Sequence, residues 1–380
     1  MMMDDVRSGD ERWVAEAIDL AWGGLGSVEP NPMVGCVIVR DGRAIGRGFH
    51  ERYGEAHAEV NALADCQRRG ESPCGATAYV TLEPCCHHGK TPPCADALIA
   101  AEISRVVVAV VDPFDQVDGG GVERLRAAGI SVSTGVQADA ATKQLAAYLK
   151  RVRTGRPWVI AKWAMSMDGR IATSSGESQW ITGGASRAGV HELRGRVEGI
   201  AVGMGTVIAD DPMLTARGGG PRTPARIVFA RSRVPEVSSR LVQTASETPV
   251  WLVAGPELSD GALARLADHE VDIIRVDSHD AAGMVDEALR RFGSSDNPSG
   301  RPMTNLMVEG GGELLGSFAA GDLIDECHVY IGAKVIGGRE APGPVGDPGF
   351  RRLHDASAFA IEDVTRFEDD VRVIYWKRSC

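Results

Sequence analysis

Four residues in the first quarter of the chain have the types and the spacing of a catalytic zinc site. His57 stands two residues before Glu59, and Cys85 and Cys94 follow, the first of them directly after a proline. Zinc binds thiolates and imidazole, and three protein ligands leave its fourth position open for water. A zinc ion held in this way lowers the pKa of the bound water from about 15.7 to about 7. Glu59 then has the role of a proton shuttle and is not a ligand.

The spacing favours a catalytic site over a structural one. Structural zinc sites are usually closed by four ligands in two short pairs, whereas here a single histidine lies far upstream of the cysteines. A His-x-Glu motif followed by two cysteines is typical of zinc-dependent nucleobase deaminases. Those enzymes usually separate the cysteines by two residues. Here the interval is longer and contains Cys86, His87 and His88 as competing ligands.

The long interval itself resembles a known family. The run from Thr81 to Cys94 reads TLEPCCHHGKTPPC and is similar to the deaminase half of the bifunctional deaminase/reductases of riboflavin biosynthesis. The resemblance implies that one zinc ion is bound by His57, Cys85 and Cys94. It also implies that the pyrimidine nucleotide substrate is contacted by Asn31, His50 and Lys90.

Two positions of this first half depart from the family pattern. Cys86 stands where the family usually has a small residue, and Phe114 stands where it usually has an asparagine that helps to hold the substrate. Cys86 lies beside a predicted ligand, and Phe114 replaces an amide with an aromatic ring that can stack.

Composition limits the class of protein. The chain has 380 residues, 43% of them hydrophobic and 24% charged, which favours two soluble globular domains. The net charge of −11 argues against a general affinity for nucleic acid and suits a small free substrate. The sequence has no apolar run of about 18 residues, so it predicts no membrane span.

The cysteines and the N-terminus favour a cytoplasmic protein. Two of the eight cysteines belong to the predicted zinc site, and the other six form no obvious disulfide framework. Residues 1–9 are polar and acidic, so we expect them to be disordered and not to form a secretory signal. These features together favour a reducing cytoplasm.

The first domain is expected over residues 10–153 and reads as an α/β domain with a mixed sheet. Apolar runs predict strands at 36–39, 44–49, 77–82, 105–111 and 130–133, and helical periodicity predicts helices at 11–22, 94–101, 122–128 and 138–153, with another that opens at His57. The resemblance implies a three-layer fold of the cytidine deaminase type. Thr154, Gly155 and Pro157 then break the last helix and mark the domain boundary.

The second domain, residues 154–380, again alternates strands with helices, so we expect another α/β domain. Two glycine-bearing turns follow its strands, one at Gly203 and Gly205 and one at 310–312. Glycine lets backbone N–H groups approach a phosphate, although neither turn is the full dinucleotide fingerprint. Taken alone, the two turns leave open whether a ligand binds there.

A resemblance covers this second half as well. The phrases MSMDGR from Met165, SSGESQWIT from Ser174 and VGMGTVIADDPMLT from Val202 are similar to the reductase half of the same family, which has a fold like dihydrofolate reductase. The resemblance implies NADPH contacts at Ala164, Trp180, Thr206, Asp210, Gly311, Gly312, Glu313, Leu314, Leu315, Gly316 and Ser317. It implies substrate contacts at Ser178, Arg194, Leu214, Arg217 and Glu309, and Lys162 is added as a polar neighbour of the nicotinamide.

One further departure lies at residues 230–232. The family commonly has an aspartate followed by a serine or threonine that contacts NADPH, whereas this chain has Ala230, Arg231 and Ser232. An arginine at this place favours the 2′-phosphate of NADPH.

Together the two resemblances imply two successive reactions. The first domain would hydrolyse an amine from a diaminopyrimidinone that carries a phosphoribosylamino group, and the second would reduce the ribosyl chain to ribityl with NADPH. We expect a homo-oligomer, a dimer or a tetramer, without nucleic acid or membrane partners. Two alternatives are an RNA-editing deaminase with an added binding module and a reductase whose zinc domain is only structural.

Overall fold

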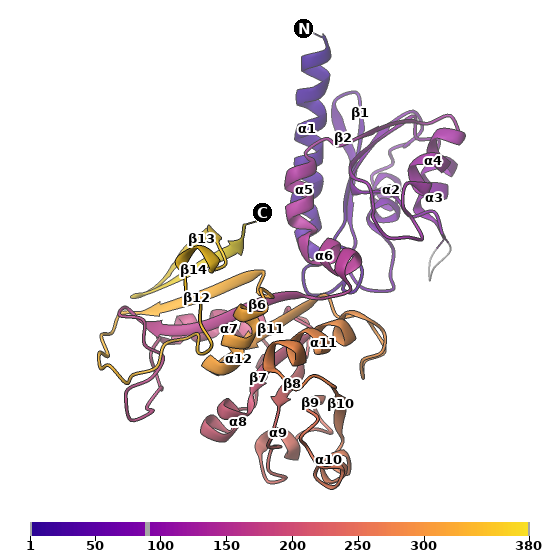
Figure 1. Ribbon diagram of the computed structural model, residues 1–380. Helices are drawn as coiled ribbons and strands as arrows, with labels where there is room; N and C mark the ends of the chain where they lie inside the picture. The colour runs from indigo at the N-terminus through magenta and orange to yellow at the C-terminus, as the bar shows by residue number, and fades with distance from the viewer. Residues whose placement is uncertain (1, 88–91, 379–380) are drawn as a thin grey trace. The chain divides into compact units, whose positions relative to one another are not determined.

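The structure is a computed structural model that describes residues 2–87 and 92–378, with side chains from Gly9 onward. It divides into two compact units, Met1–Thr154 and Gly155–Cys380 (Figure 1). In this described part of the chain, no helix is long and apolar enough to cross a membrane. Lys90 and His88, both of interest in the sequence, lie outside the described residues.

Unit 1 is built on a five-stranded mixed sheet with the order β2-β1-β3-β4-β5. Its strands are β1 (Gly35–Arg40), β2 (Arg43–Phe49), β3 (Thr77–Leu82), β4 (Arg105–Val110) and β5 (Ser131–Thr134). β1 runs antiparallel to both β2 and β3, whereas β3, β4 and β5 are parallel. The apolar residues of β1, β3 and β4 are buried on both faces, as the apolar runs in the sequence predict.

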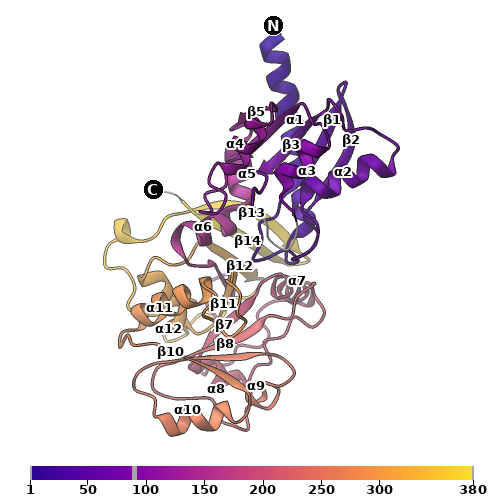
Figure 2. The same ribbon diagram turned by 90° about the vertical axis from the view of Figure 1, so that its right-hand side faces the viewer.

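Helices cover both faces of this sheet (Figure 2). One face packs against α1 (Met2–Ala21), α5 (Ala138–Gln144) and α6 (Ala146–Thr154), and the other against α2 (Ala58–Arg68), α3 (Cys94–Ala100) and α4 (Gly120–Ala127). A short 3-10 turn, η1 (Trp22–Gly24), follows α1. The three-layer α/β architecture predicted for this half is therefore confirmed.

Two helices differ from the sequence-based expectation. α1 begins at Met2 and not at Glu11, so residues 2–9, expected to be disordered, are helical. The helix is anchored where this segment ends, because the buried Asp10 accepts hydrogen bonds from Tyr79 Oη at 2.9 Å and from Arg105 Nη2 at 2.7 Å. The single helix expected over 138–153 is two helices, which meet at Leu145.

Unit 2 has a nine-stranded sheet with the order β10-β9-β8-β7-β11-β6-β12-β14-β13. Its strands are β6 (Trp158–Ser166), β7 (Gly199–Gly203), β8 (Ala225–Ala230), β9 (Val250–Ala254), β10 (Val271–Arg275), β11 (Asn305–Glu309), β12 (Glu326–Gly332), β13 (Phe359–Phe367) and β14 (Asp370–Lys377). The first seven in the order are parallel, and β14 and β13 add an antiparallel hairpin. The carboxyl ends of the parallel strands therefore meet at one edge, which is where ligands bind in open α/β sheets.

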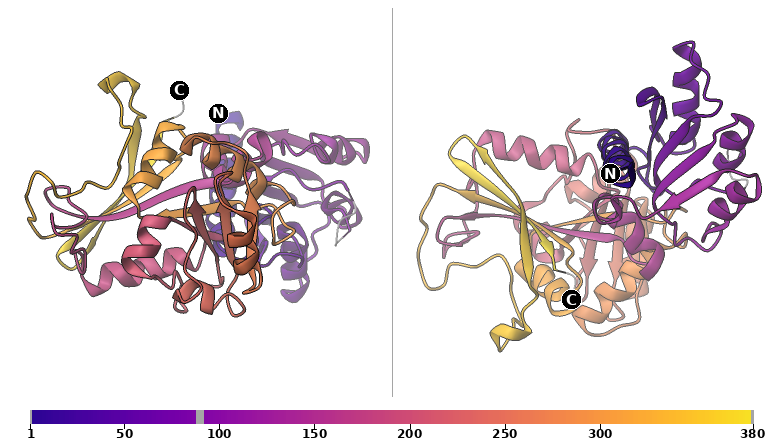
Figure 3. Two further views of the ribbon diagram at one scale, coloured as in Figure 1. Left: turned by 60° about the horizontal axis from the view of Figure 1, so that its bottom comes forward. Right: turned by 90° about the horizontal axis from the view of Figure 1, so that it is seen from above.

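Helices cover both faces of this second sheet (Figure 3). One face packs against α7 (Gly184–Arg194), α8 (Met204–Asp210), α9 (Arg240–Gln243) and α10 (Asp260–Ala267), and the other against α11 (Ala281–Gly293) and α12 (Gly312–Ala320). A 3-10 turn, η2 (Leu353–Asp355), precedes β13. Sequence reasoning had not predicted β13, α8, α9 or α12 as separate elements.

Candidate functional site

The predicted zinc ligands come from two helix starts and the loop after a strand. His57 directly precedes α2 in extended conformation, and Glu59 lies in the first turn of that helix. Cys85 follows β3 after two intervening residues, and Cys94 is the first residue of α3. α2 and α3 pack on the same face of the sheet, and this shared face brings the histidine and both cysteines together.

The distances between the donor atoms fit a tetrahedral zinc ion. His57 Nδ1 lies 3.7 Å from Cys85 Sγ and 3.4 Å from Cys94 Sγ. With Zn–S of about 2.3 Å and Zn–N of about 2.0–2.1 Å, tetrahedral angles place nitrogen and sulfur about 3.6 Å apart. All three donor atoms lie within 4.8 Å of one another, so these residues fit a shared zinc ion.

The surroundings favour the thiolate form of Cys85, which is the form that binds metal. The hydrogen bond from the Cys94 thiol, followed by that from His57, lowers the pKa of Cys85 to about 4 although burial opposes the shift. The backbone N–H of Cys94 also donates to Cys85 Sγ at 3.3 Å. The same pairing raises the pKa of Cys94.

Glu59 is buried beside this group, with only 3% of its surface exposed. Burial, followed by the negative charge of Cys85, raises the pKa of its carboxyl group. A carboxyl group that is easily protonated and lies next to the metal ligands is suited to accepting a proton and returning it.

Two of the three predicted substrate contacts lie next to His57. His50 Nδ1 donates to Ala56 O at 3.0 Å, which leaves Nε2 to accept from Asn31 Nδ2 at 3.1 Å. The rings of His50 and His57 are 5.0 Å apart, edge to face. Asn31, His50 and His57 therefore form a continuous row, whereas the third predicted contact, Lys90, lies outside the described residues.

Cys86 and Phe114, the two departures from the family pattern, lie on two neighbouring loops that contact each other. Cys86 Sγ donates to Gln116 O at 3.6 Å, and Cys86 does not belong to the metal-binding group. The Phe114 ring lies beside His87, with centroids 6.3 Å apart. Both contacts join the described part of the cysteine loop to the loop that follows β4.

Glu83 is a residue of this site that sequence reasoning missed. Its buried carboxylate accepts backbone N–H groups from Asp112 at 3.2 Å, Gly119 at 3.1 Å and Val122 at 2.9 Å. It thereby fastens the loop that carries Phe114 to the strand end that carries Cys85. The signal was present in the sequence, because an acidic residue within a buried apolar strand end requires partners.

In unit 2, the two glycine turns face each other at the carboxyl edge of the sheet. β7 and β11 are neighbours, and Gly310 and Gly311 have φ of +76° and +78°, which favours glycine. A Cβ atom built on Gly311 would lie 3.3 Å from Thr206 Oγ1 and 3.8 Å from Gly203 N. The turns therefore form a cradle that side chains would fill, as close approach of a dinucleotide phosphate requires.

Charged residues gather beside this cradle. Glu309, the last residue of β11, accepts from Arg194 Nε at 2.5 Å and Nη2 at 2.7 Å, and Lys162 Nζ lies 3.6 Å away. Burial alone would raise the pKa of Glu309, but the charges of Arg194 and Lys162 hold this pKa at about 2. Arg194 Nη1 also donates to Thr215 O. Most of the Arg194 guanidinium is therefore engaged within the protein, which sequence reasoning had not foreseen.

His191, one turn before Arg194 on α7, was also missed. Its Nδ1 is buried and has no hydrogen-bond partner among the described residues. Burial, followed by the charges of Arg194 and Arg217, lowers the pKa of the imidazole. A neutral ring with an unused acceptor nitrogen is a candidate partner for a substrate hydroxyl.

The other predicted reductase residues lie along the same edge or in the loops that follow it. Ala164 pairs with Tyr330 across β6 and β12, Thr206 and Asp210 belong to α8, and Gly312–Ser317 open α12. Leu214 and Arg217 have left-handed φ of 50° and 49°, a strain that is common in ligand-binding loops. Ser178 and the exposed Trp180 lie in the loop before α7, where the Arg187 guanidinium stacks 4.6 Å from the Trp180 ring.

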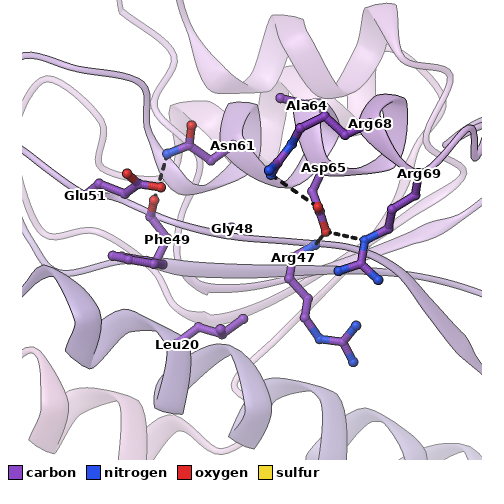
Figure 4. Close-up of a pocket in the computed structure, with 10 residues that line it drawn as sticks. All are labelled: Leu20, Arg47, Gly48, Phe49, Glu51, Asn61, Ala64, Asp65, Arg68 and Arg69. Atoms are coloured by element: carbon purple, nitrogen blue, oxygen red, sulfur yellow. Dashed lines mark hydrogen bonds and ion pairs between the residues drawn. The ribbon is translucent and has the colours of Figure 1, made fainter.

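A separate hollow of about 510 Å³ lies at the edge of the unit 1 sheet, between α1, β2 and α2 (Figure 4). There Asp65 Oδ2 accepts from Arg47 N at 2.9 Å, and Asn61 Nδ2 donates to Phe49 O at 2.8 Å. These bonds satisfy the outer edge of β2, which would otherwise be open to strand pairing. The predicted site residues lie elsewhere in the unit.

Comparison with known proteins matches both halves of the chain. Residues 7–110 match the family described as the cytidine and deoxycytidylate deaminase zinc-binding region, and residues 157–367 match the RibD C-terminal domain. The riboflavin biosynthesis protein RibD of Escherichia coli strain K12 is 40% identical over 376 residues, which cover 95% of this chain and 98% of that protein. The chain belongs to the RibD family.

Solved RibD structures agree with this assignment. Acinetobacter baumannii RibD superposes with a TM-score of 0.84 at 35% identity, covering 98% of this chain and all of that one. A Thermotoga maritima protein described as a diaminohydroxyphosphoribosylaminopyrimidine deaminase/5-amino-6-(5-phosphoribosylamino)uracil reductase superposes with a TM-score of 0.82 at 33% identity, covering 98% and 99%.

Membership of the RibD family confirms the predicted activities. The chain is a bifunctional deaminase and reductase of riboflavin biosynthesis that acts on a small molecule, with zinc as the cofactor of the deaminase domain and NADPH as that of the reductase domain. The alternatives of an RNA-editing deaminase and of a reductase with a purely structural zinc domain do not account for matches to both halves.

Proposed function

We propose that residues 10–153 deaminate a diaminopyrimidinone carrying a phosphoribosylamino group, and that residues 154–380 reduce the ribosyl chain of the product to ribityl. The observation that carries the deaminase half is the spacing of the His57, Cys85 and Cys94 donor atoms, which fits a tetrahedral zinc ion, beside the buried Glu59. The substrate assignment rests on the likeness to the Thermotoga maritima protein and its description.

In the deaminase site, His57, Cys85 and Cys94 hold zinc, which when bound polarises water for attack on a ring carbon. Glu59 would accept a proton from the attacking water on a carboxylate oxygen and deliver it to the amine nitrogen, which leaves as ammonia when its bond to carbon breaks. The row of Asn31 and His50 presents polar groups to the edge of the pyrimidine. Lys90 supplies a positive charge for the phosphate.

In the reductase site, NADPH would supply the hydride when bound, and the turns around Thr206 and Gly311 would hold its phosphates. The reduction also consumes a proton. Burial lowers the pKa of Lys162, so its ammonium group gives up a proton more readily than a solvated one. Glu309 and Arg194 fix the position of Lys162, and Ser178, Leu214 and Arg217 complete the substrate contacts.

Incubation with the diaminopyrimidinone nucleotide, with and without NADPH, tests both halves. We expect ammonia and the deaminated nucleotide without NADPH, and the ribityl product with it, both identified by mass. Glu59→Gln should retain zinc and lose ammonia release by at least about a hundredfold. Release at the wild-type rate by this variant would refute the role of Glu59, and no NADPH oxidation with the deaminated nucleotide would refute the reductase assignment.

We further propose that the protein works in the cytoplasm as a homo-oligomer. The edge strand β13 exposes Ile361 and Val364, which are 63% and 59% accessible, and apolar side chains on an open strand edge favour pairing with another chain. Light scattering on the purified protein should give a mass of two or four chains. The mass of a single chain at micromolar concentration would exclude the oligomer.

A further inference from the structure

His328 is a buried histidine of unit 2 that has no assigned role. It lies on β12, and only 6% of its surface is exposed. Its Nε2 donates to Glu326 Oε1 at 2.6 Å, and the other oxygen of that carboxylate accepts from Trp158 Nε1 at 2.8 Å. Glu326 is therefore held in place by the indole, and it orients the imidazole ring with the hydrogen on Nε2.

The second ring nitrogen of His328 lacks a partner. Nδ1 is buried, and no hydrogen bond to it is formed within residues 9–87 and 92–378. A buried polar atom without a partner costs free energy, so its presence calls for an explanation. Because the hydrogen on Nε2 is directed to Glu326, Nδ1 is the nitrogen that can take up a proton and give it away.

The register of the sheet places His328 beside the charged residues of the reductase site. Lys162 on β6 is the register partner of both Glu309 on β11 and His328 on β12. The three side chains therefore form one lateral row on one face, on strands about 4.7–4.9 Å apart. Lys162 Nζ lies 3.6 Å from Glu309 Oε2 and 5.9 Å from the centre of the Tyr330 ring, which also belongs to β12. The ammonium group thus lies between the side chains of β11 and those of β12.

The reduction consumes a proton at this place. Lys162 is the donor proposed above, and only 15% of its side chain is exposed, so water has little access to it even before the substrate binds. A buried donor that gives up its proton needs a nearby source to regain one. An imidazolium on the neighbouring strand is such a source, because imidazolium is ordinarily a stronger acid than ammonium.

Ionisable groups on the neighbouring elements surround His328. They are Glu326 and Tyr330 on β12, Lys162 on β6, Glu309 on β11, Arg372 on β14 and Glu192 on α7. Of these groups, the Glu326 carboxylate is in direct contact with the ring, and its negative charge stabilises a positively charged imidazole. Glu326 therefore prepares His328 to hold a proton beside Lys162.

We propose that His328, oriented by Glu326, is a proton relay that recharges Lys162 during the reduction. Overall, hydride from NADPH forms a C–H bond at the ribosyl carbon, the bond from that carbon to the ring oxygen breaks, and the oxygen takes up the proton of Lys162. The proton on His328 Nδ1 moves to Lys162 Nζ, directly or through one water, and His328 regains a proton from solvent between turnovers. Each hydride is thus matched by one solvent proton. His328 acts through Lys162, and the relay rests on the reductase function proposed above.

The titration of His328 in the full-length protein without nucleotides tests whether the two side chains are coupled. NMR of the rings follows the nine histidines of the chain, and the spectrum of His328→Gln identifies the signal. Lys162→Met removes a neighbouring positive charge and should raise the pH at which His328 titrates by about one unit. Glu326→Gln removes the negative charge and should lower it by about one unit.

Single-turnover reduction tests the relay itself. The rate constant of NADPH oxidation would be measured with the protein in excess over the purified deaminated nucleotide, across the pH range of about 5 to 8 in which histidines titrate. The wild-type rate should fall as His328 loses its proton, and Glu326→Gln should move this fall to lower pH. His328→Gln should lower the rate at least about tenfold and abolish this pH dependence. His354→Gln, which removes an exposed histidine 2.9 Å from Asp355 Oδ1, is the matched control.

Two further measurements separate the relay from a structural role. Fluorescence titration with NADPH should give the wild-type dissociation constant for His328→Gln, and ammonia release with the urea midpoint shows that the chain is folded. If His328→Gln does not fold, the displaced pH dependence of Glu326→Gln decides.

Four results would overturn the relay. They are an unchanged rate and pH dependence in His328→Gln, a loss in that variant explained by NADPH affinity alone, an unmoved pH dependence in Glu326→Gln, and a titration of His328 indifferent to Lys162→Met. If the wild-type protein oxidises no NADPH with the deaminated nucleotide, the reductase function fails instead, and the titrations still show whether His328 and Lys162 are coupled.

Discussion

Cys85 and Cys86 are adjacent in the sequence but face different partners. Cys85 Sγ lies 3.7 Å from His57 Nδ1, whereas Cys86 Sγ points to Gln116 O. The two neighbouring side chains therefore contact different groups, and only Cys85 belongs to the metal-binding group. The sequence alone left Cys86 as a competitor, and the direction of its side chain removes it from the ligand group.

This difference predicts the metal content of three variants. Cys85→Ser and Cys94→Ser should each lower the affinity for zinc by more than about a hundredfold, because even the loss of an outer partner of a ligand typically costs tenfold to a hundredfold. Cys86→Ser should retain one zinc ion per chain. Zinc would be measured by elemental analysis after dialysis against a chelator. Zinc loss in Cys86→Ser together with retention in Cys85→Ser would reverse the ligand assignment.

Much of the site was predictable because its residues belong to short motifs. His57 and Glu59 follow from residue type and spacing, whereas the choice of Cys85 and Cys94 over Cys86 is what the family resemblance implies, and the three donor atoms do lie together. The bidentate pairing of Arg194 with Glu309 was not predictable, since it joins residues 115 positions apart. Tertiary partners of this kind depend on which strands become neighbours.

Among the elements, buried strands were predicted best. The apolar run at Thr77–Leu82 matches β3 at both ends, and the run from Arg105 differs from β4 by one residue. β13 was missed because it is an edge strand whose side chains are mostly exposed, and it therefore lacks an apolar pattern. α8 and α12 were missed because they are short and begin at glycine-bearing turns.

The element β8 depends on one charged residue in its interior. Arg226 is fully buried, and it donates to Thr244 Oγ1 at 2.7 Å, Thr244 O at 2.8 Å and Thr248 O at 2.6 Å. Burial lowers the pKa of this guanidinium to about 10. The arginine joins the strand to the partly buried carbonyl groups of Thr244 and Thr248, at and beyond the end of α9.

Replacing this arginine should destabilise unit 2. Arg226→Met removes the donor to Thr248 O and one of the donors to Thr244 O, so the free energy of unfolding should fall by about 1–3 kcal/mol. Arg226→Lys keeps the charge but loses the planar fork of donors, so it should lower the free energy of unfolding by a smaller amount. The midpoint of urea unfolding measures both changes, with the exposed Arg265→Met as the control. If Arg226→Met were as stable as this control, the carbonyl groups would not depend on the arginine.

At the scale of the whole molecule, each unit contains a complete hydrophobic core and a complete candidate site. The deaminase residues lie between Asn31 and Cys94, and the reductase residues lie between Lys162 and Ser317. Each unit has two large clusters of buried apolar residues, and no cluster contains buried residues of both units. We therefore predict that neither reaction needs a residue from the other unit of the same chain.

This independence predicts that two disabled chains restore the pathway when they are mixed. Glu59→Gln removes the proton shuttle of the first reaction, and Lys162→Met removes the proposed proton donor of the second while nearly preserving side-chain volume. Alone, the first variant should release no ammonia, and the second should stop at the deaminated nucleotide. Together they should form the ribityl product after a lag, because the intermediate must leave one chain and reach another.

Mass analysis over time measures this, and addition of the deaminated nucleotide to Glu59→Gln confirms that its reductase is intact. If both half-reactions persist separately but the mixture yields no ribityl product, the intermediate must be passed within one chain, and the two units do not act independently.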